Sequence, residues 1–213
     1  NVQPGGAALY AAVAAKTLFD DVCLSSVVGR GYPFLDVLNF FPRRYLKTYK
    51  GPSTKFSISY DEHWEAHYLE AYYGPGSKIL SSITLLDKIQ PDSIVHVSPL
   101  PPAKVEKIVS AVRKASAETK VSVNTWIGYI KGKKNREILR KLASEVDFFI
   151  MSDSEAKNLT ETTALSTALR LLKAKMLVVT LRELGAVINS ENSGTQVVPA
   201  LRFPVERIVD TTG

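Results

Sequence analysis

A pair of glycines stands directly before an alanine-rich segment near the start of the chain. Pro4, Gly5 and Gly6 precede residues 7–18, whose composition predicts a helix. Glycines let a ligand approach the backbone, and the free N–H groups at a helix start attract oxygen-rich or anionic groups. A tight strand-to-helix turn explains the same glycines, and on these residues alone it is the better supported interpretation.

A second candidate site is the sequence Asp210-Thr211-Thr212-Gly213, which follows a short apolar pair. The carboxylate and hydroxyl oxygens of such a turn can bind a cation, and its backbone N–H groups can begin an anion-binding nest. The sequence ends at this point, so the rest of the turn cannot be read.

The remaining polar candidates are more scattered. Asn124 follows an apolar run, and ligands of α/β proteins meet the carboxyl ends of buried strands, so we expect Asn124 to contact a substrate. His63, His67 and His96 share no motif with a carboxylate or cysteine at metal-ligand spacing, which favours structural roles. Cys23 is the single cysteine, so no intrachain disulfide can form and a reducing cytoplasm is the expected location.

The elements that position these residues alternate along the second half of the chain. Short apolar runs predict buried parallel strands, and the segments between them have helical periodicity, which is typical of an α/β fold. Two helices are expected from apolar residues at i, i+3, i+4 and i+7, beginning at Val105 and at Leu165. The predicted strands are residues 93–97, 121–124, 148–151 and 177–180.

Residues 54–74 have a different pattern. Phe56, Ile58 and Tyr60 alternate with serines, and an aromatic run follows from His67 to Tyr73. This alternation predicts an antiparallel hairpin that projects from the main domain and covers a site.

Composition limits the possible partners. The chain has 213 residues, a formal net charge of +6 and 45% hydrophobic residues, which are globular values, and no apolar run is long enough to span a membrane. Basic residues concentrate in residues 131–141 without aromatic side chains that could stack on bases, so a solvated helix face is favoured over a nucleic-acid site.

Five segments follow one another in an informative order: GGAALYAAVAA (5–15), GPSTKFSISYDE (51–62), VDFFIMSDSEAKNLT (146–160), LVVTLRELGAVI (177–188) and DTTG (210–213). In this order they resemble the acceptor-binding glycine pair, the β lid, the NxxE segment, the TxGxxGA turn and the start of the DTTGAGD motif of the ribokinase (PfkB) family. The resemblance implies an α/β fold, a ribokinase-like three-layer sandwich with a mostly parallel central sheet and a small β-sheet lid. It also implies a single domain over residues 1–213, incomplete at both ends, with its lid hairpin at about 52–74.

The same resemblance implies transfer of the γ-phosphoryl group of ATP to a hydroxyl of a sugar, polyol or nucleoside. ATP and Mg²⁺ are the expected cofactors, with a monovalent cation such as K⁺ beside them. The family's catalytic aspartate would lie after Gly213, so no catalytic residue is expected within this chain. The implied sites are the acceptor (Gly5, Gly6 and Tyr10), the nucleotide and its phosphates (Thr180, Arg182, Gly185, Thr211, Thr212 and Gly213), and the metal ions (Glu155 and Asp210); Asn124 is added to the acceptor site from its place after a strand.

Three residues depart from the family pattern. Tyr10 stands where many members have asparagine, which points to a differently shaped acceptor. Ser152 replaces the asparagine of NxxE, and Arg182 replaces the first glycine of TxGxxG. Arg182 either contacts a phosphate or points into solvent.

Two other functional classes remain open on the sequence. A ligand-binding or regulatory protein on the same scaffold would bind its ligand without turnover, and a nucleic-acid-binding protein would show steeply salt-dependent affinity. The expected partners are nonetheless a small sugar, polyol or nucleoside, without nucleic acid or membrane, and a second copy of the chain paired through the β lid.

Overall fold

The computed structural model describes residues 2–62, 66–79, 89–202 and 204. These residues fall into two compact units, the first within residues 1–87 and 203–213 and the second within residues 88–202. Each has a hydrophobic core of its own. The single domain expected over residues 1–213 stays a prediction.

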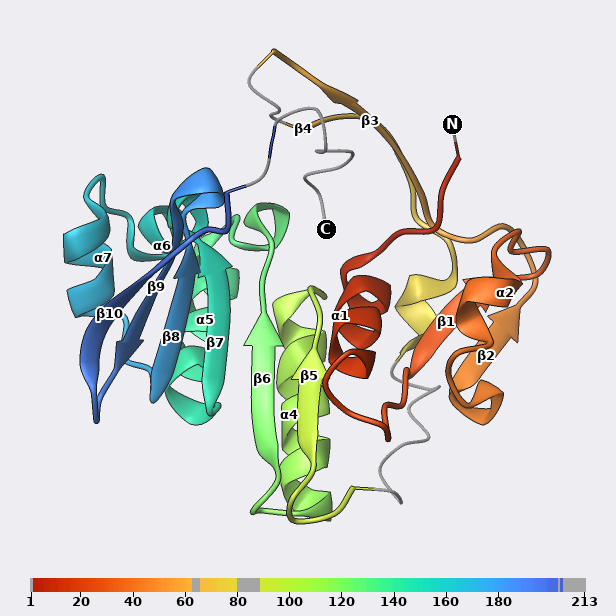
Figure 1. Ribbon diagram of the computed structural model, residues 1–213, viewed down its shortest axis with the longest axis horizontal. Coiled ribbons are helices and arrows are strands. Elements are labelled where there is room, and N and C mark those ends of the chain that lie inside the picture. The colour runs from red at the N-terminus through yellow and green to blue at the C-terminus, as the bar shows by residue number, and fades with distance from the viewer. Residues whose placement is uncertain (1, 63–65, 80–88, 203, 205–213) are drawn as a thin grey trace. The chain divides into compact units, whose positions relative to one another are not determined.

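The second unit is built on a six-stranded sheet with the order β10-β9-β8-β7-β6-β5 (Figure 1). Neighbouring strands from β5 to β8 pair in parallel, whereas β9 pairs antiparallel with both β8 and β10. The sheet is therefore mostly parallel, with an antiparallel margin. Its strands are β5 (Ile94–Val97), β6 (Lys120–Asn124), β7 (Phe148–Ser152), β8 (Met176–Thr180), β9 (Gly185–Ser190) and β10 (Gly194–Pro199).

Amphipathic helices connect the parallel strands. They are α4 (Pro102–Ala115), α5 (Lys133–Glu145), α6 (Asp153–Thr160) and α7 (Leu165–Leu171). Val105 and Val112, seven residues apart on α4, are both buried, as the helical spacing predicts. Val121 and Val123 on β6 are fully buried, and Figure 1 shows α4 alongside β5 and β6. The core of this unit thus lies between the sheet and its helices.

The four strands predicted from apolar runs are confirmed, with ends that differ by at most one residue. The antiparallel strands β9 and β10 were not expected. All six residues of β10 are exposed, so this strand carries no apolar pattern that reveals it.

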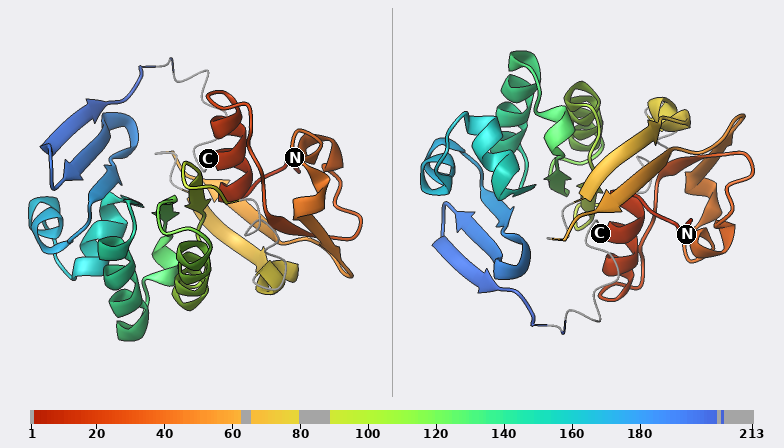
Figure 2. Two further views of the ribbon diagram at one scale, coloured as in Figure 1. Left: turned by 90° about the horizontal axis from the view of Figure 1, so that it is seen from below. Right: turned by 90° about the horizontal axis from the view of Figure 1, so that it is seen from above.

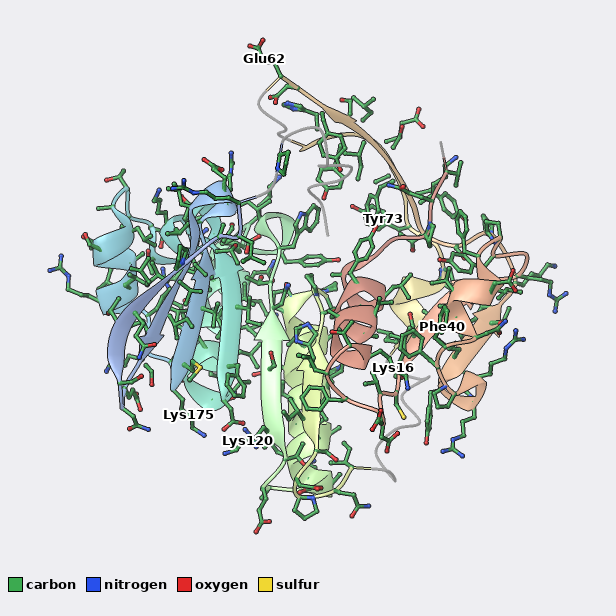
Figure 3. All side chains as sticks on the ribbon, in the orientation of Figure 1. Lys16, Phe40, Glu62, Tyr73, Lys120 and Lys175 are labelled. Carbon is green, nitrogen blue, oxygen red and sulfur yellow. The ribbon has the colours of Figure 1, made fainter. Side chains whose placement is uncertain are left out.

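A buried carboxylate joins several segments near the amino ends of the parallel strands. Asp147 accepts hydrogen bonds from the Val121 N–H at 2.8 Å, from Arg113 at 2.7 Å and from Lys175 at 3.2 Å. Figure 3 labels Lys175 at this end of the sheet. Burial alone would raise the pKa of Asp147, but these three donors outweigh burial and lower the pKa to about 2. We call Asp147 and its three partners the Asp147 network.

The first unit contains a short helix and a two-stranded parallel sheet. Helix α1 (Ala7–Lys16) ends two residues before the predicted end at residue 18. Strands β1 (Ser26–Gly29) and β2 (Leu46–Tyr49) pair in parallel, and α2 (Leu35–Leu38) and the 3₁₀ turn η1 (Arg43–Tyr45) lie between them in sequence. The buried core of this unit consists of Leu9, Ala12, Leu24, Leu38 and Phe41.

The predicted hairpin is confirmed as strands β3 (Lys55–Tyr60) and β4 (Ala66–Tyr72), which pair antiparallel with a register shift at residues 57 and 58. Figure 2 shows this pair as an extended two-stranded ribbon. At its root the Ser53 hydroxyl accepts a hydrogen bond from the Gly29 N–H at 2.8 Å, and the Thr54 hydroxyl accepts one from the Gly74 N–H at 3.1 Å. The 3₁₀ turn η2 (Pro75–Lys78) follows.

Among the described residues, no helix is long and apolar enough to cross a membrane.

Candidate functional site

The carboxyl ends of three neighbouring strands gather most of the candidate residues of the second unit. We call this end of β5 to β8 the carboxyl edge. Asn124 is the last residue of β6 and pairs with Ile150 on β7, and Ser152 at the end of β7 pairs with Thr180 at the end of β8. Parallel strands thereby place these polar positions at one edge, where α/β proteins bind ligands.

Glu155 starts helix α6 together with Ser152. The Ser152 side chain accepts a hydrogen bond from the Glu155 N–H at 3.2 Å, and the Glu155 carboxylate accepts one from the Ser152 N–H at 3.0 Å. This reciprocal pair is a capping box, which satisfies two backbone donors at the helix start. The spacing of serine and glutamate three residues apart already signalled such a box in the sequence, and our sequence interpretation missed it.

The environment of Glu155 changes its protonation. Burial is the largest effect on the pKa of Glu155 and raises it, and the negative charge of Asp153 raises it further. Hydrogen bonds from the backbone N–H groups of Ser152 and Ile127 lower the pKa, but the net pKa lies above the ordinary value. Glu155 is 9% exposed. A buried carboxyl with a raised pKa at the carboxyl edge is the profile of a functional group, although its backbone contacts also give it a structural role.

Opposite charges meet beside the start of α6. Asp153 accepts a hydrogen bond from Lys157 at 3.0 Å. Burial would raise the pKa of Asp153, but the Lys157 hydrogen bond, the Ser154 N–H and the positive charges of Lys157 and Arg182 lower it below its usual value. Arg182, from the turn after β8, therefore lies close enough to interact with a carboxylate on the neighbouring segment.

Two residues in the turn between β8 and β9 have positive φ angles. Leu181 donates its N–H to the Gly185 carbonyl at 2.7 Å, which closes the turn around η5 (Arg182–Leu184). Gly185 has φ 110°, and a Cβ there would lie 2.0 Å from the Val198 carbonyl oxygen, so only glycine fits. Arg182 has φ 53°, a left-handed conformation that costs a residue with a side chain about 1–2 kcal/mol. Backbone strain of this kind concentrates at functional sites.

The glycine pair lies in the first unit. Gly6 has φ 106° and directly precedes α1, so the predicted glycine-to-helix transition is present. Tyr10 donates its hydroxyl proton to the Pro4 carbonyl at 3.2 Å, which folds the side chain back onto the segment before the helix. A hydroxyl held in this way leaves Tyr10 oriented by its own chain.

Some predicted site residues lie outside the described part of the chain. These are Asp210, Thr211, Thr212 and Gly213, and also His63. Of the other two histidines, His67 contacts Asp61 at 3.0 Å and His96 contacts Ser122 at 3.0 Å. Within the described residues no cluster of three or more histidine, cysteine or acidic side chains could hold a metal ion.

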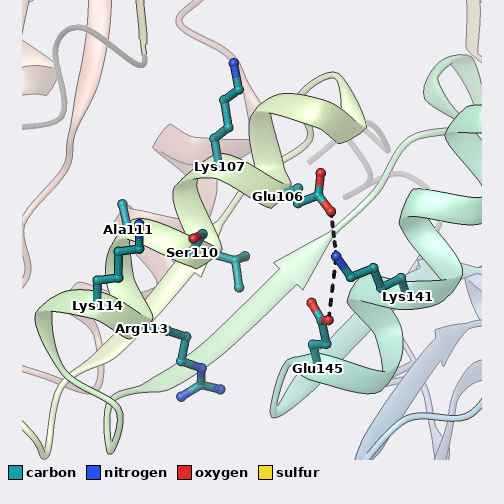
Figure 4. A pocket seen from close by; sticks show the side chains of 9 residues that line it. Glu106, Lys107, Ser110, Ala111, Arg113, Lys114, Lys141 and Glu145 are labelled. Carbon is teal, nitrogen blue, oxygen red and sulfur yellow. Dashed lines mark hydrogen bonds and ion pairs between the residues drawn. The ribbon is translucent and has the colours of Figure 1, made fainter.

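Several residues of the basic run form ion pairs with their own chain. Arg136 and Arg140 both pair with Glu161, at 2.9 and 3.2 Å, and Lys141 pairs with Glu106 at 2.8 Å. Figure 4 shows Lys141 on α5 reaching toward Glu106 on α4, beside the pocket that these helices line. The solvated helix face that the sequence favoured stays a prediction.

Comparison with known proteins identifies the family. The sequence pattern of the pfkB family carbohydrate kinases matches residues 53–213. The chain belongs to this family. The pfkB chain is also 25% identical to the cytidine kinase of Thermococcus kodakarensis, over 99% of the chain and 76% of that protein.

Solved structures of kinases share the fold of this pfkB chain. A nucleoside kinase of Burkholderia thailandensis in complex with inosine matches with a TM-score of 0.80 at 20% identity, over 98% of the chain and 67% of that protein. A fructokinase of Vibrio cholerae with bound fructose, ADP and calcium matches with a TM-score of 0.69 at 19% identity, over 99% and 72%. The ribokinase-like α/β fold and the class of ATP-dependent sugar or nucleoside kinase, both expected from the sequence, are confirmed.

Proposed function

We propose that the intact protein transfers the γ-phosphoryl group of ATP to a hydroxyl of a nucleoside. The observation that carries this proposal is the carboxyl edge, where a polar strand end, a buried acid and a strained arginine turn occur together. The nucleoside acceptor is supported by the similarity to a cytidine kinase and to a nucleoside kinase solved with inosine. A sugar or polyol acceptor remains the alternative within the same chemistry.

The residues of this chain would act mainly by positioning. Thr180, Arg182 and Gly185 would flank the nucleotide, because their turn combines backbone N–H groups with a cationic side chain that suits phosphate oxygens. Asn124 would contact the acceptor from the neighbouring strand end. Holding both substrates in line supplies much of the catalysis in phosphoryl transfer.

Metal ions would complete the nucleotide site. Mg²⁺, when bound, supplies charge neutralisation for the phosphoryl group in transfer. Glu155 would act through metal-bound water. Two backbone hydrogen bonds hold its buried carboxyl in place, and the remaining lone pairs of the carboxyl can accept hydrogen bonds from water. Asp210 with Thr212 would hold a monovalent cation. Fructokinase structures of this fold contain ADP with a calcium or a potassium ion.

The remaining parts are also proposals. In the first unit Gly5, Gly6 and Tyr10 would contact the acceptor, and Thr211, Thr212 and Gly213 would begin the anion-binding turn. The carboxylate that removes the hydroxyl proton would follow Gly213, and the protein would work in the cytoplasm.

The hairpin β3–β4 would pair two copies of the chain. Phe56 packs edge-to-face on Tyr68 and on Tyr73, with ring centroids 5.7 and 5.9 Å apart, and these aromatic side chains are 41–65% exposed. Phe56→Ser should shift the molecular mass measured by light scattering from dimer to monomer. A wild-type protein that is already monomeric at micromolar concentration contradicts this pairing.

The direct test is phosphorylation by the full-length protein of a panel containing cytidine, inosine, adenosine, fructose and inositol with ATP and Mg²⁺. Product formation with at least one nucleoside, at higher kcat/KM than with fructose, is expected. Fructose as the best acceptor would move the assignment to the sugar alternative. Calorimetry that detects ligand binding without turnover would instead support the regulatory scaffold, which the departures at Ser152 and Arg182 motivate.

A further inference from the structure

The amino ends of three neighbouring strands bring two lysines to one buried carboxylate. Asp147 directly precedes β7, whose neighbours in the sheet are β6, which begins at Lys120, and β8, which directly follows Lys175. Because these strands are parallel, their amino ends meet at the same end of the sheet, where Figure 3 labels Lys120 and Lys175. The Nζ atoms of Lys120 and Lys175 lie 4.0 and 3.2 Å from the same oxygen, Oδ1 of Asp147.

The charge of Asp147 is balanced without either lysine. Arg113 donates a hydrogen bond to the other carboxylate oxygen, Oδ2, at 2.7 Å, and its further hydrogen bonds go to backbone carbonyls. Among the described residues, no other carboxylate lies within ion-pair distance of Lys120 or Lys175. Three cations and one anion therefore leave an excess of two positive charges at this point.

The two ammonium groups keep most of their hydrogen-bonding capacity. An ammonium group has three N–H donors, of which Lys175 uses one on Asp147, whereas Lys120, at 4.0 Å, is too far from Asp147 for a hydrogen bond. The side chains of Lys120 and Lys175 are 61% and 56% exposed, so the remaining donors are open to solvent.

The charge and the donors together select a phosphate group. A phosphate group carries about −1.5 to −2 charges at pH 7 and has three acceptor oxygens, so it can neutralise the excess charge while different oxygens bond to the two lysines. A carboxylate carries a single negative charge and would leave half of the excess uncompensated.

We propose that Lys120 and Lys175 bind the phosphate group of a small anion, either inorganic phosphate or a phosphomonoester, at the amino end of the sheet. The site lies at the opposite end of the strands from the carboxyl edge and takes no part in phosphoryl transfer. Because only the folded chain brings the two lysines together, the bound anion stabilises the fold.

The experiment measures the Tm of the full-length protein as inorganic phosphate is added at constant ionic strength, with Mg²⁺ and a non-hydrolysable ATP analogue present to occupy the nucleotide site. The Tm of the wild type should rise with phosphate. The Lys120→Gln/Lys175→Gln double variant should raise the Kd of phosphate at least about tenfold, since each ammonium group contributes a charge-assisted hydrogen bond. Lys120→Gln alone should raise the Kd about threefold to tenfold, and it tests the site even if the double variant does not fold.

The double variant Lys133→Gln/Lys134→Gln is the matched control. It removes the same charge from exposed positions of α5, where Lys133 lies 4.0 Å from Glu137, the same distance as Lys120 from Asp147. The control pair lacks a carboxylate shared with a second lysine, so the Kd of phosphate should equal that of the wild type.

Glycerol phosphate separates the two sources of the anion. An equal Kd for inorganic phosphate and glycerol phosphate assigns binding to the phosphate group alone, and a lower Kd for glycerol phosphate supports the site with a phosphomonoester as its ligand. The inference is overturned if neither anion raises the Tm of the wild type, or if the rise is the same in Lys120→Gln/Lys175→Gln. An oligodeoxynucleotide that binds more tightly per phosphate than inorganic phosphate also overturns it, because that result assigns the lysines to a nucleic-acid surface. None of these outcomes depends on turnover, so they leave the proposed kinase function untouched.

Discussion

Buried polar groups at the two ends of the parallel strands differ in their hydrogen bonding and in the direction of their pKa shifts. At the amino end, Asp147 is surrounded by three hydrogen-bond donors, and its pKa is lowered to about 2. At the carboxyl edge, Glu155 has a raised pKa, Arg182 has a left-handed backbone, and one buried oxygen on each of Ser98 and Asn124 has no hydrogen-bond partner among the described residues.

This difference indicates that one end of the sheet mainly stabilises the fold and the other end mainly serves function. A satisfied network stabilises the fold, because removing any member leaves a buried charge or donor without a partner. Strain, raised pKa values and unsatisfied atoms cost stability, so they persist where another requirement maintains them. We therefore expect changes at the amino end to alter folding, and changes at the carboxyl edge to alter binding and turnover.

The largest effect is expected for Asp147→Ala. Loss of the carboxylate leaves the Val121 N–H without its acceptor and removes the counter-charge of Arg113, which keeps only backbone carbonyl acceptors. The change should cost about 3–5 kcal/mol of unfolding free energy in urea titrations. Glu161→Ala, which removes exposed ion pairs to Arg136 and Arg140, is the control and should cost less than about 1 kcal/mol. Equal losses in the two variants would remove the distinction between a buried network and surface pairs.

Glu155→Gln tests the carboxyl edge. Glutamine can maintain the capping box with Ser152, so the unfolding free energy should change by less than about 1 kcal/mol. Without the carboxylate, kcat/KM should fall about 10- to 100-fold, and the Mg²⁺ concentration needed for half-maximal activity should rise. A purely structural role for Glu155 predicts an unchanged Mg²⁺ dependence.

Acid should weaken the Asp147 network. The pKa of Asp147 is about 2 in the folded protein and 3.8 ordinarily, so its contribution is fully present above pH 4 and is lost as the pH falls toward 2. The difference corresponds to about 2 kcal/mol. The unfolding free energy of Asp147→Asn should lack this part of the acid dependence. Parallel pH curves for wild type and variant would show that other carboxylates dominate.

The smallest and most specific effect is expected at Arg182. Arg182→Gly removes the left-handed strain and should raise the unfolding free energy by about 1 kcal/mol, whereas Arg182→Ala should leave it nearly unchanged. Both variants lose the guanidinium, so both should raise the KM of ATP about threefold to tenfold. If Arg182→Gly gains stability without any change in the KM of ATP, Arg182 has no contact with the nucleotide.

Much of the fold could be predicted because buried parallel strands are continuous apolar runs. Residues 121–124 and 177–180 could be predicted as strands for that reason, and the alternation around Phe56 predicted the hairpin. Strand β10 is exposed along its whole length, so its sequence carries no such pattern. The Asp147 network joins residues 26 to 34 positions apart, and no local spacing records it.

The candidate site was predicted in part. The structure places Asn124, Glu155, Thr180, Arg182 and Gly185 near the carboxyl edge of one sheet, as expected from strand order. The capping role of Glu155 was readable from its spacing to Ser152. The buried Ser98 hydroxyl without a partner among the described residues could not have been found, because no spacing in the sequence records which polar atoms become buried.

The hairpin β3–β4 is held tightly at its root and extends far from it. Two side-chain hydroxyls accept hydrogen bonds from two glycine N–H groups there. A Cβ at Gly29 or Gly74 would lie within 2.6 Å of neighbouring backbone atoms, so the chain is closely packed at this point. Strands of this length extend about 20 Å, so a rotation of about 10° at the root would displace the far end by about 3.5 Å. A small rotation about the four root residues would therefore move the far end of the hairpin by about an atom's diameter without changing the pairing of its strands.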